Sequence, residues 1–302
     1  MDTNPQPESP AAAKPSRGKI FVQRSISATV LWGTLLASLF LTDQNLAKSI
    51  FLLLMMLLAG FGLQEFYTIM AKAGQPAYRR LGIMGGLLMV VGVFLFVAHR
   101  NKPDGALTFE VLWISAFTLL VFLTHLSAEE KGASISVTVL GIIYVPVLLG
   151  FIQQIRFYNA DGPWYLLLFI LATKLSDTGA YVVGSLVGRH KMVPSISPGK
   201  TWEGFAGALI FSIAAACLLF HFAPGHFRGM TMLNIATLGL LLGLGAVLGD
   251  LIESKLKRDA DVKDSGQSLP GIGGVLDLLD SLLFNAPLMY LYLKVFLPVL
   301  KP

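Results

Sequence analysis

Pairs of acidic residues in the second half of the sequence lie in or beside apolar stretches. Asp250 and Glu253 are three residues apart, and so are Asp277 and Asp280. Residues at this spacing share one face of a helix. A carboxylate in hydrocarbon costs several kcal/mol unless it pairs, binds a cation or faces water. These residues are therefore candidates for chemistry rather than for packing.

The position of the two pairs predicts a metal site. Asp250 falls near the end of one apolar run and Asp277 near the start of the next, so the pairs can meet at similar depth. Four carboxylates that converge without comparable helix-borne cations would repel one another. A hard divalent cation such as Mg²⁺ would relieve that repulsion by taking oxygen ligands.

The segment between the two pairs, SKLKRDADVKDSGQSLPGIGG, combines basic residues with Gly, Ser and Pro. It supplies Lys257, Arg258, Lys263 and Asp264. Basic side chains and a Gly-rich backbone beside a metal suit a polyphosphate, because an anion needs both charge and close N–H donors.

An earlier polar loop, GRHKMVPSISPGKTWEG, contains neither a Walker A motif nor a dinucleotide-binding fingerprint. It does hold Lys200 and Thr201 at the entrance to an apolar run, a position suited to anions.

The elements that must carry these residues are membrane helices. Of 302 residues, 54% are hydrophobic and 14% are charged, which indicates that the bilayer is the solvent. Backbone polar groups find no partners in lipid, so each apolar run that can cross ~30 Å of hydrocarbon must be helical. We predict an all-α polytopic integral membrane protein with about nine transmembrane helices. The runs cover approximately residues 26–41, 49–70, 81–98, 107–126, 135–155, 164–188, 202–222, 233–252 and 271–297.

The composition of the N-terminal residues and the distribution of Lys and Arg between the loops predict the domain organisation and the orientation. The Pro-, Ala- and Ser-rich residues 1–25 predict a disordered cytoplasmic tail, and residues 26–302 a single transmembrane domain. With the N-terminus inside, 15 Lys and Arg residues fall in cytoplasmic segments and 7 on the other side, with Lys174 within a helix. This bias predicts cytoplasmic active-site loops. Short loops and the lack of a targeting peptide fit a bacterial inner membrane. The net charge of +5 then reflects basic loops, and no nucleic-acid motif accompanies it.

The pattern S-x-x-K-R-x4-K-D-x-G-x3-P-G-x-G-G-x2-D-x2-D runs from Ser254 to Asp280. It resembles the signature of the phosphatidate cytidylyltransferase (CDP-diacylglycerol synthase) family. The stretches SDTGAYVVGSLVGRHK, SPGKTWEG and GDLIESKLKR are also similar to that family, so the resemblance covers a catalytic region at about 174–285 in detail. The signature corresponds here to Ser254, Lys257, Arg258, Lys263, Asp264, Gly266, Pro270, Gly271, Gly273, Gly274, Asp277 and Asp280.

The resemblance implies transfer of a cytidylyl group from CTP to phosphatidic acid, giving CDP-diacylglycerol and pyrophosphate. It implies Mg²⁺ as cofactor, alone or with a second cation, and it leaves a homodimer open. Metal ligands are then expected to be Asp250 and Asp277. The further catalytic residues expected are Asp264, Lys263, Asp280 and Asp177. The residues expected to bind substrate are Lys200, Thr201, Ser254, Lys257, Arg258, Gly273 and Gly274.

Two positions depart from the family pattern and keep alternatives open. Ile272 stands where the family commonly has His, and Leu278 where it commonly has Arg. A catalytically lapsed homologue acting as a scaffold is one alternative, although the carboxylates and basic residues are retained. The other is a cation-coupled transporter, because intramembrane carboxylates also line ion paths. A transporter favours interrupted helices repeated in both halves, and the sequence shows no such repeat.

Overall fold

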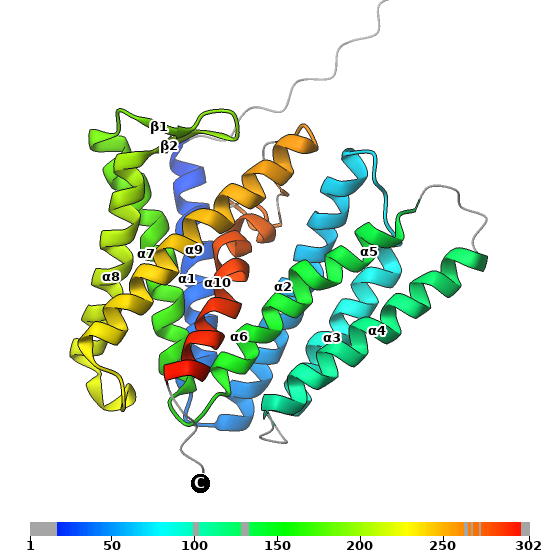
Figure 1. Ribbon diagram of the computed structural model, residues 1–302, viewed down its shortest axis with the longest axis horizontal. Helices are drawn as coiled ribbons and strands as arrows, with labels where there is room; N and C mark the ends of the chain where they lie inside the picture. Colours follow the sequence, from blue (N-terminus) through cyan, green and yellow to red (C-terminus); the bar gives the residue numbers. More distant parts are fainter. Residues whose placement is uncertain are drawn as a thin grey trace, which may run out of the picture.

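The computed structural model describes residues 17–98, 103–127, 133–262, 265–266, 268–271 and 273–296. Helices dominate these residues (Figure 1). The elements in chain order are α1 Arg17–Phe40, α2 Gln44–Lys72, α3 Arg79–Ala98, α4 Pro103–Ser127, α5 Ile135–Ile142, η1 Ile143–Val147, α6 Leu148–Arg156, α7 Gly162–Val187, β1 Lys191–Val193, β2 Ser197–Thr201, α8 Trp202–Phe222, η2 Pro224–His226, α9 Met232–Asp259 and α10 Val275–Phe296.

The predicted all-α membrane architecture is confirmed. Within the described residues, eight helical segments are long and apolar enough to cross a membrane. Each of the nine apolar runs overlaps a helix, and α1 is the one outside those eight. The last run was predicted to begin at residue 271, whereas α10 begins at Val275. The sequence of α1 includes Arg17, Lys19 and Arg24 in its first half, which lowers its hydropathy. The chain is therefore an integral membrane protein.

The N-terminal boundary differs from the prediction. Helix α1 begins at Arg17, whereas the tail was predicted to extend to residue 25. Tertiary contacts explain the earlier start: Arg24 Nε donates to the carbonyl oxygen of Gly271, and Ser27 Oγ donates to that of Pro270 at 2.8 Å. A prediction from composition alone does not see such contacts. Residues 1–16 lie outside the described part of the chain.

The span over residues 135–156 contains a short π-helix. Helix α5 passes into η1 and then α6, and Pro146 lies within η1. Proline has no N–H to donate and its ring crowds the preceding turn, so a local change of helical pitch lets the span continue.

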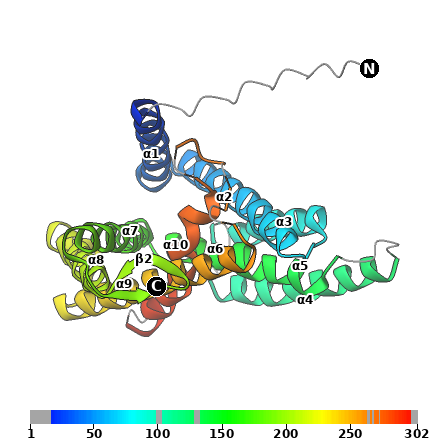
Figure 2. The same ribbon diagram turned by 90° about the horizontal axis from the view of Figure 1, so that it is seen from above.

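The helices form two regions joined by α10 and α6. Figure 2 shows α7, α8 and α9 on one side, α2 to α5 on the other, and α10 with α6 between them. Helix α10 packs against α9, α7, α6 and α2. Helices α9 and α10 cross so closely at Gly249 that a Cβ atom there would lie only 2.7 Å from the backbone oxygen of Asp280. The absence of a side chain at Gly249 therefore permits this crossing. The glycines of the run 239–249 let α9 pack closely against its neighbours.

A small β-hairpin that the sequence did not predict lies over one end of the α7–α9 region. Strands β1 and β2 pair antiparallel, with Lys191 opposite Thr201. Glu203 in the first turn of α8 accepts hydrogen bonds from the backbone N–H groups of Arg189 (3.1 Å) and His190 (3.2 Å). The hairpin therefore has a fixed attachment to α8, at the same end of the molecule as the C-terminus of α9 (Figure 1).

Candidate active site

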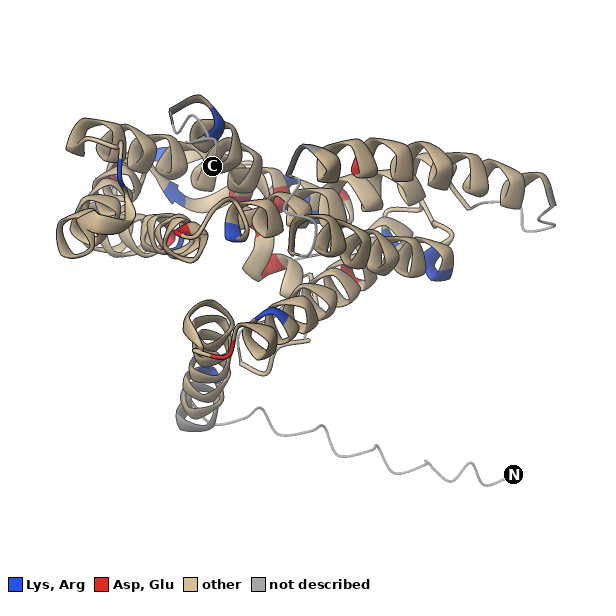
Figure 3. Cartoon of the chain, turned by 90° about the horizontal axis from the view of Figure 1, so that it is seen from below, with Lys and Arg blue, Asp and Glu red and all other residues tan. Residues whose placement is uncertain are grey.

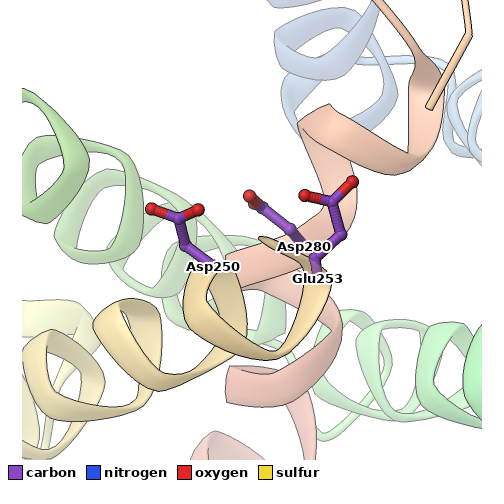
Figure 4. Close-up of side chains that lie close together, drawn as sticks. All are labelled: Asp250, Glu253 and Asp280. Carbon is purple, nitrogen blue, oxygen red and sulfur yellow. The ribbon is translucent and has the colours of Figure 1, made fainter. Parts of the chain in front are cut away.

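Three carboxylates from α9 and α10 converge where these helices cross. Asp250, Glu253 and Asp280 each offer an oxygen, and the three oxygens lie within 4.8 Å of one another. Figure 4 shows the side chains approaching one space from the two helices. Glu253 is buried, with 1% of its surface exposed. The crossing at Gly249 and the three-residue spacing on α9 together create this cluster.

Asp277, predicted as a metal ligand, lies beside this carboxylate cluster with other partners. Its Oδ1 is 2.8 Å from Lys257 Nζ, and its Oδ2 accepts the N–H of Gly274 at 2.9 Å. The buried hydroxyl of Ser265 lies between Asp277 Oδ1 and Glu253 Oε1, and is 2.7 Å from the latter. Asp277 thus links the start of α10 to α9 through Lys257.

Lysines are interleaved with the carboxylates, and here the sequence interpretation was wrong to expect no comparable helix-borne cations. Lys257 on α9 lies 2.6 Å from Glu253 Oε2. Lys174 on α7 lies 3.3 Å from Asp177 and 3.9 Å from Asp280. The Lys257–Glu253 and Lys174–Asp177 pairs each lie within about one helical turn. Lys174 and Asp280 are far apart in sequence, so spacing alone could not reveal the contact between them. Lys200, which ends β2 together with Thr201, contributes a third pair with Asp250 at 2.8 Å.

The donor set fits a metal ion. Among the described residues, five carboxylates and three lysines make up this group, so negative charge is in excess. Figure 3 shows acidic positions gathered near the middle of the molecule, whereas the outer helices are mostly uncharged. Three converging carboxylate oxygens are the donors that hard divalent cations prefer. The carboxylates of this group can bind a cation, and its lysine ammonium groups can bind an anion.

Other predicted site residues support these groups. Ser254 Oγ donates to Asp250 Oδ1 at 3.3 Å. Thr201 caps α8, its Oγ1 accepting the N–H of Gly204 at 3.1 Å. Arg258 Nε donates to the carbonyl oxygen of Ile196 at 3.4 Å, which connects α9 to the hairpin.

The two predicted glycines shape the turn before α10. Gly273 has a φ of 125°, a conformation that side chains disfavour, and pairs with Leu269 in an isolated β-bridge. Gly274 donates its N–H to Asp277, as described above. The predictions for Lys263 and Asp264, and the departure at Ile272, lie outside the described residues.

Two pockets meet at Asp177. The first, of about 290 Å³, lies between α7, α8, α9 and the hairpin, and is lined by Asp250, Lys200 and Thr201 among others. The second, of about 330 Å³, lies between α1, α2, α6, α7 and α10. Its wall is mostly apolar, and Lys174 lies with Asp177 at its polar part. The first pocket, here called the hairpin pocket, and the second, the apolar pocket, thus share one carboxylate next to the cluster.

Glu65 on α2 is a polar contact that the sequence analysis missed. It is 4% exposed, and its Oε2 accepts the N–H of Leu276 in the first turn of α10 at 2.8 Å. Its Oε1 accepts the hydroxyl of Ser268. The signal was present, because a carboxylate inside an apolar run is a candidate by default. Glu65 has no second acidic residue at helical spacing, so it lacks the pattern that marks the pairs in the second half.

These features define a polytopic membrane protein whose site suits a metal ion and a phosphate-bearing substrate. Residues 22–296 match the model of the cytidylyltransferase family. The chain belongs to this family.

Named relatives agree with the family match. The chain is 32% identical over 210 residues to the phosphatidate cytidylyltransferase of Staphylococcus aureus, a match over 69% of this chain and 78% of the relative. It is 42% identical over 154 residues to the phosphatidate cytidylyltransferases of Mycobacterium bovis and Mycobacterium tuberculosis. Those matches cover 51% of this chain and 49% and 45% of the two relatives, so the chain spans about half the length of each.

Proposed function

We propose that the chain is a phosphatidate cytidylyltransferase that transfers the cytidylyl group of CTP to phosphatidic acid. The observation that carries this proposal is that the hairpin pocket, lined by Lys200 and Asp250, and the apolar pocket share Asp177 beside a carboxylate cluster. A transferase that joins a water-soluble nucleotide to a membrane lipid needs this arrangement. The family match and the names of the relatives support the same reaction.

The hairpin pocket suits the nucleotide. Lys200 Nζ lies between Asp250 Oδ2 (2.8 Å) and the carbonyl oxygen of Val247 (3.1 Å), so its charge is held at the pocket wall. A fixed ammonium group beside a cation site lowers the cost of bringing in a triphosphate. Arg258 and Lys263 remain predicted phosphate contacts.

The apolar pocket suits the lipid. Leu31, Trp32 and Leu35 of α1 form part of its wall, opposite residues of α7 and α10. An acyl chain placed there keeps its contact with apolar groups, while the lipid phosphate reaches Lys174. The Lys174 ammonium also donates to the carbonyl oxygen of Leu278 (2.8 Å) and to Ser281 Oγ (3.1 Å), which fixes its direction.

In the reaction, an oxygen of the lipid phosphate attacks the α-phosphorus of CTP, and the bond from that phosphorus to the bridging oxygen breaks. Pyrophosphate leaves, and CDP-diacylglycerol remains. Asp250, Glu253 and Asp280 would hold Mg²⁺, which supplies neutralisation of charge on the phosphate oxygens. The lysines hold the two anionic reactants close together against their mutual repulsion. Positioning and charge neutralisation provide the catalysis.

A labelled-nucleotide assay tests this function. Purified protein is given phosphatidic acid, Mg²⁺ and CTP labelled at either the α- or the γ-phosphate. The α-label should enter the lipid and the γ-label should appear in pyrophosphate. Diacylglycerol, which lacks the attacking phosphate, should accept no label. Labelling of diacylglycerol, or no lipid labelling from α-labelled CTP, would contradict the proposal.

For location, we propose the plasma membrane of a bacterium with the hairpin side facing the cytoplasm, where CTP is present. The bacterial relatives support the location. The excess of basic residues in the alternate loops supports the orientation. A cysteine placed at Ser195, in a Cys217→Ser background, should react with a membrane-impermeant maleimide only after cells are opened. Reaction in intact cells would reverse the orientation.

A further inference from the structure

Glu65 connects the two regions of the molecule at the start of the helix that carries two of the site carboxylates. It lies on α2, in the region without the carboxylate cluster, and contacts Ser268 and Leu276 beside α10. Both of its carboxylate oxygens are used in these contacts. These contacts indicate that Glu65 helps to place the start of α10.

The contact with Leu276 is a helix cap supplied by another helix. Leu276 is the second residue of α10, and the first N–H groups of a helix have no partners within it. A carboxylate at this end satisfies one such donor and interacts favourably with the helix dipole. Asp277 accepts from Gly274 in the same turn, so two carboxylates define where α10 begins.

The surrounding backbone is shaped around the Glu65 carboxylate. A Cβ atom at Gly266 would lie 2.4 Å from Glu65 Oε1, and one at Gly274 would lie 2.6 Å from Oε2. A side chain at either position would require the carboxylate to shift from its present place. The two glycines therefore let the backbone close around Glu65, and a residue without the carboxylate leaves that space unfilled.

We propose that Glu65 is a positioning residue for the transfer reaction, holding the first turn of α10 so that Asp277 and Asp280 face α9. This inference rests on the proposed function. Glu65 acts through α10 and does not touch the reacting atoms. Its effect reaches the carboxylate cluster because Asp280 lies one helical turn beyond Leu276 on a rigid element.

Two substitutions separate positioning from direct participation. Glu65→Ala removes both acceptors, and should lower kcat about tenfold or more while the KM values for both substrates stay within about threefold. Glu65→Gln should retain most of the activity. Its amide oxygen can accept from Leu276, and the Ser268 hydroxyl can turn to accept from the amide nitrogen.

Glu110→Ala is the matched control. Glu110 is also a buried glutamate of the first region, 3% exposed, and it accepts a hydrogen bond from Gln154 of α6 at 3.1 Å. Its loss should leave kcat within about twofold of the parent protein when the variant is folded. Ser268→Ala, which removes one of the two donors to Glu65, should lower kcat about threefold and tests the same contact in a milder variant.

Calorimetric titration with Mn²⁺, without CTP or lipid, provides a readout apart from activity. Glu65→Ala should weaken Mn²⁺ binding about fivefold, and Glu110→Ala should not change it. Normal kcat and normal Mn²⁺ affinity in folded Glu65→Ala would overturn the inference, and so would a Glu65→Gln variant as impaired as Glu65→Ala. An inactive parent protein would instead contradict the proposed function, while the Mn²⁺ titration would still decide the role of Glu65.

Discussion

Buried carboxyl groups occur in both regions of the molecule, but their partners differ. In the α2 to α5 region, Glu65 and Glu110 are each held by neutral donors. In the α7 to α10 region, carboxylates lie close to one another and to lysines. Neutral donors satisfy a single carboxyl group and fix structure. Crowded carboxylates repel one another, and a bound cation relieves that repulsion. The ammonium groups beside them can contact a phosphate-bearing substrate.

The largest loss should follow from Asp280→Asn, which keeps the shape of the side chain but removes a charge from the carboxylate cluster. If Asp280 holds the cation during transfer, the rate should fall about a hundredfold or more, or roughly 3 kcal/mol. Steady-state kinetics of CDP-lipid formation measure this. Asp259→Asn is the control, because Asp259 is exposed and paired with Lys255, and its rate should stay within about twofold. Equal rates for the Asp280→Asn and Asp259→Asn variants would contradict a catalytic role that is specific to the clustered carboxylates.

Asp277→Asn should cause a smaller loss, about thirtyfold, because Lys257 and Ser265 would lose a charged partner. A Mg²⁺ titration of the same variant sharpens the comparison. If Asp277 anchors α10 and does not bind the metal, the Mg²⁺ concentration that gives half-maximal rate should not change. A large increase in that concentration would support the sequence-based assignment of Asp277 as a metal ligand.

The two pockets should respond separately. Lys174→Gln removes the ammonium group at the polar part of the apolar pocket, and should raise the KM for phosphatidic acid about tenfold. Lys200→Gln should raise the KM for CTP by a similar factor. Titration of each substrate at a saturating level of the other measures both. If Lys174→Gln instead raised the KM for CTP and Lys200→Gln raised the KM for phosphatidic acid, the assignment of nucleotide and lipid to the two pockets would be reversed.

The smallest effect is expected from Leu278→Arg, which restores the residue common in the family. Leu278 lines the apolar pocket, and its carbonyl oxygen already accepts from Lys174. Since a cation is present there, turnover should change by less than about threefold. An inactive parent protein that gains strong activity on this substitution, alone or with Ile272→His, would support the lapsed-enzyme alternative.

Much of the fold was predictable because lipid forces apolar runs to be helical. Each of the nine runs overlaps a helix, and the paired spacing correctly placed Asp250 and Glu253 on one helical face, with Asp280 on the next helix. The hairpin was not predictable, because its attachment to Glu203 is a backbone contact with no sequence pattern. The earlier start of α1 likewise depends on tertiary contacts.

The arrangement of the site was predictable only in part. Local spacing identifies carboxylates that share a helix face, but it cannot show which lysine reaches them from another helix. Lys174 and Lys200 meet Asp280 and Asp250 across long separations in sequence. The same reason explains why Glu65 was missed, since its partners lie about two hundred residues away.

The central claim is that the carboxylate cluster of α9 and α10 binds a divalent cation. Electron paramagnetic resonance of Mn²⁺ with purified protein, without nucleotide or lipid, tests it most directly. The parent protein should reduce the signal of free Mn²⁺, and added Mg²⁺ should restore it. The Asp250→Asn, Asp280→Asn double variant should bind Mn²⁺ at least about tenfold more weakly. Equal Mn²⁺ binding by the parent protein and the folded double variant would contradict the account.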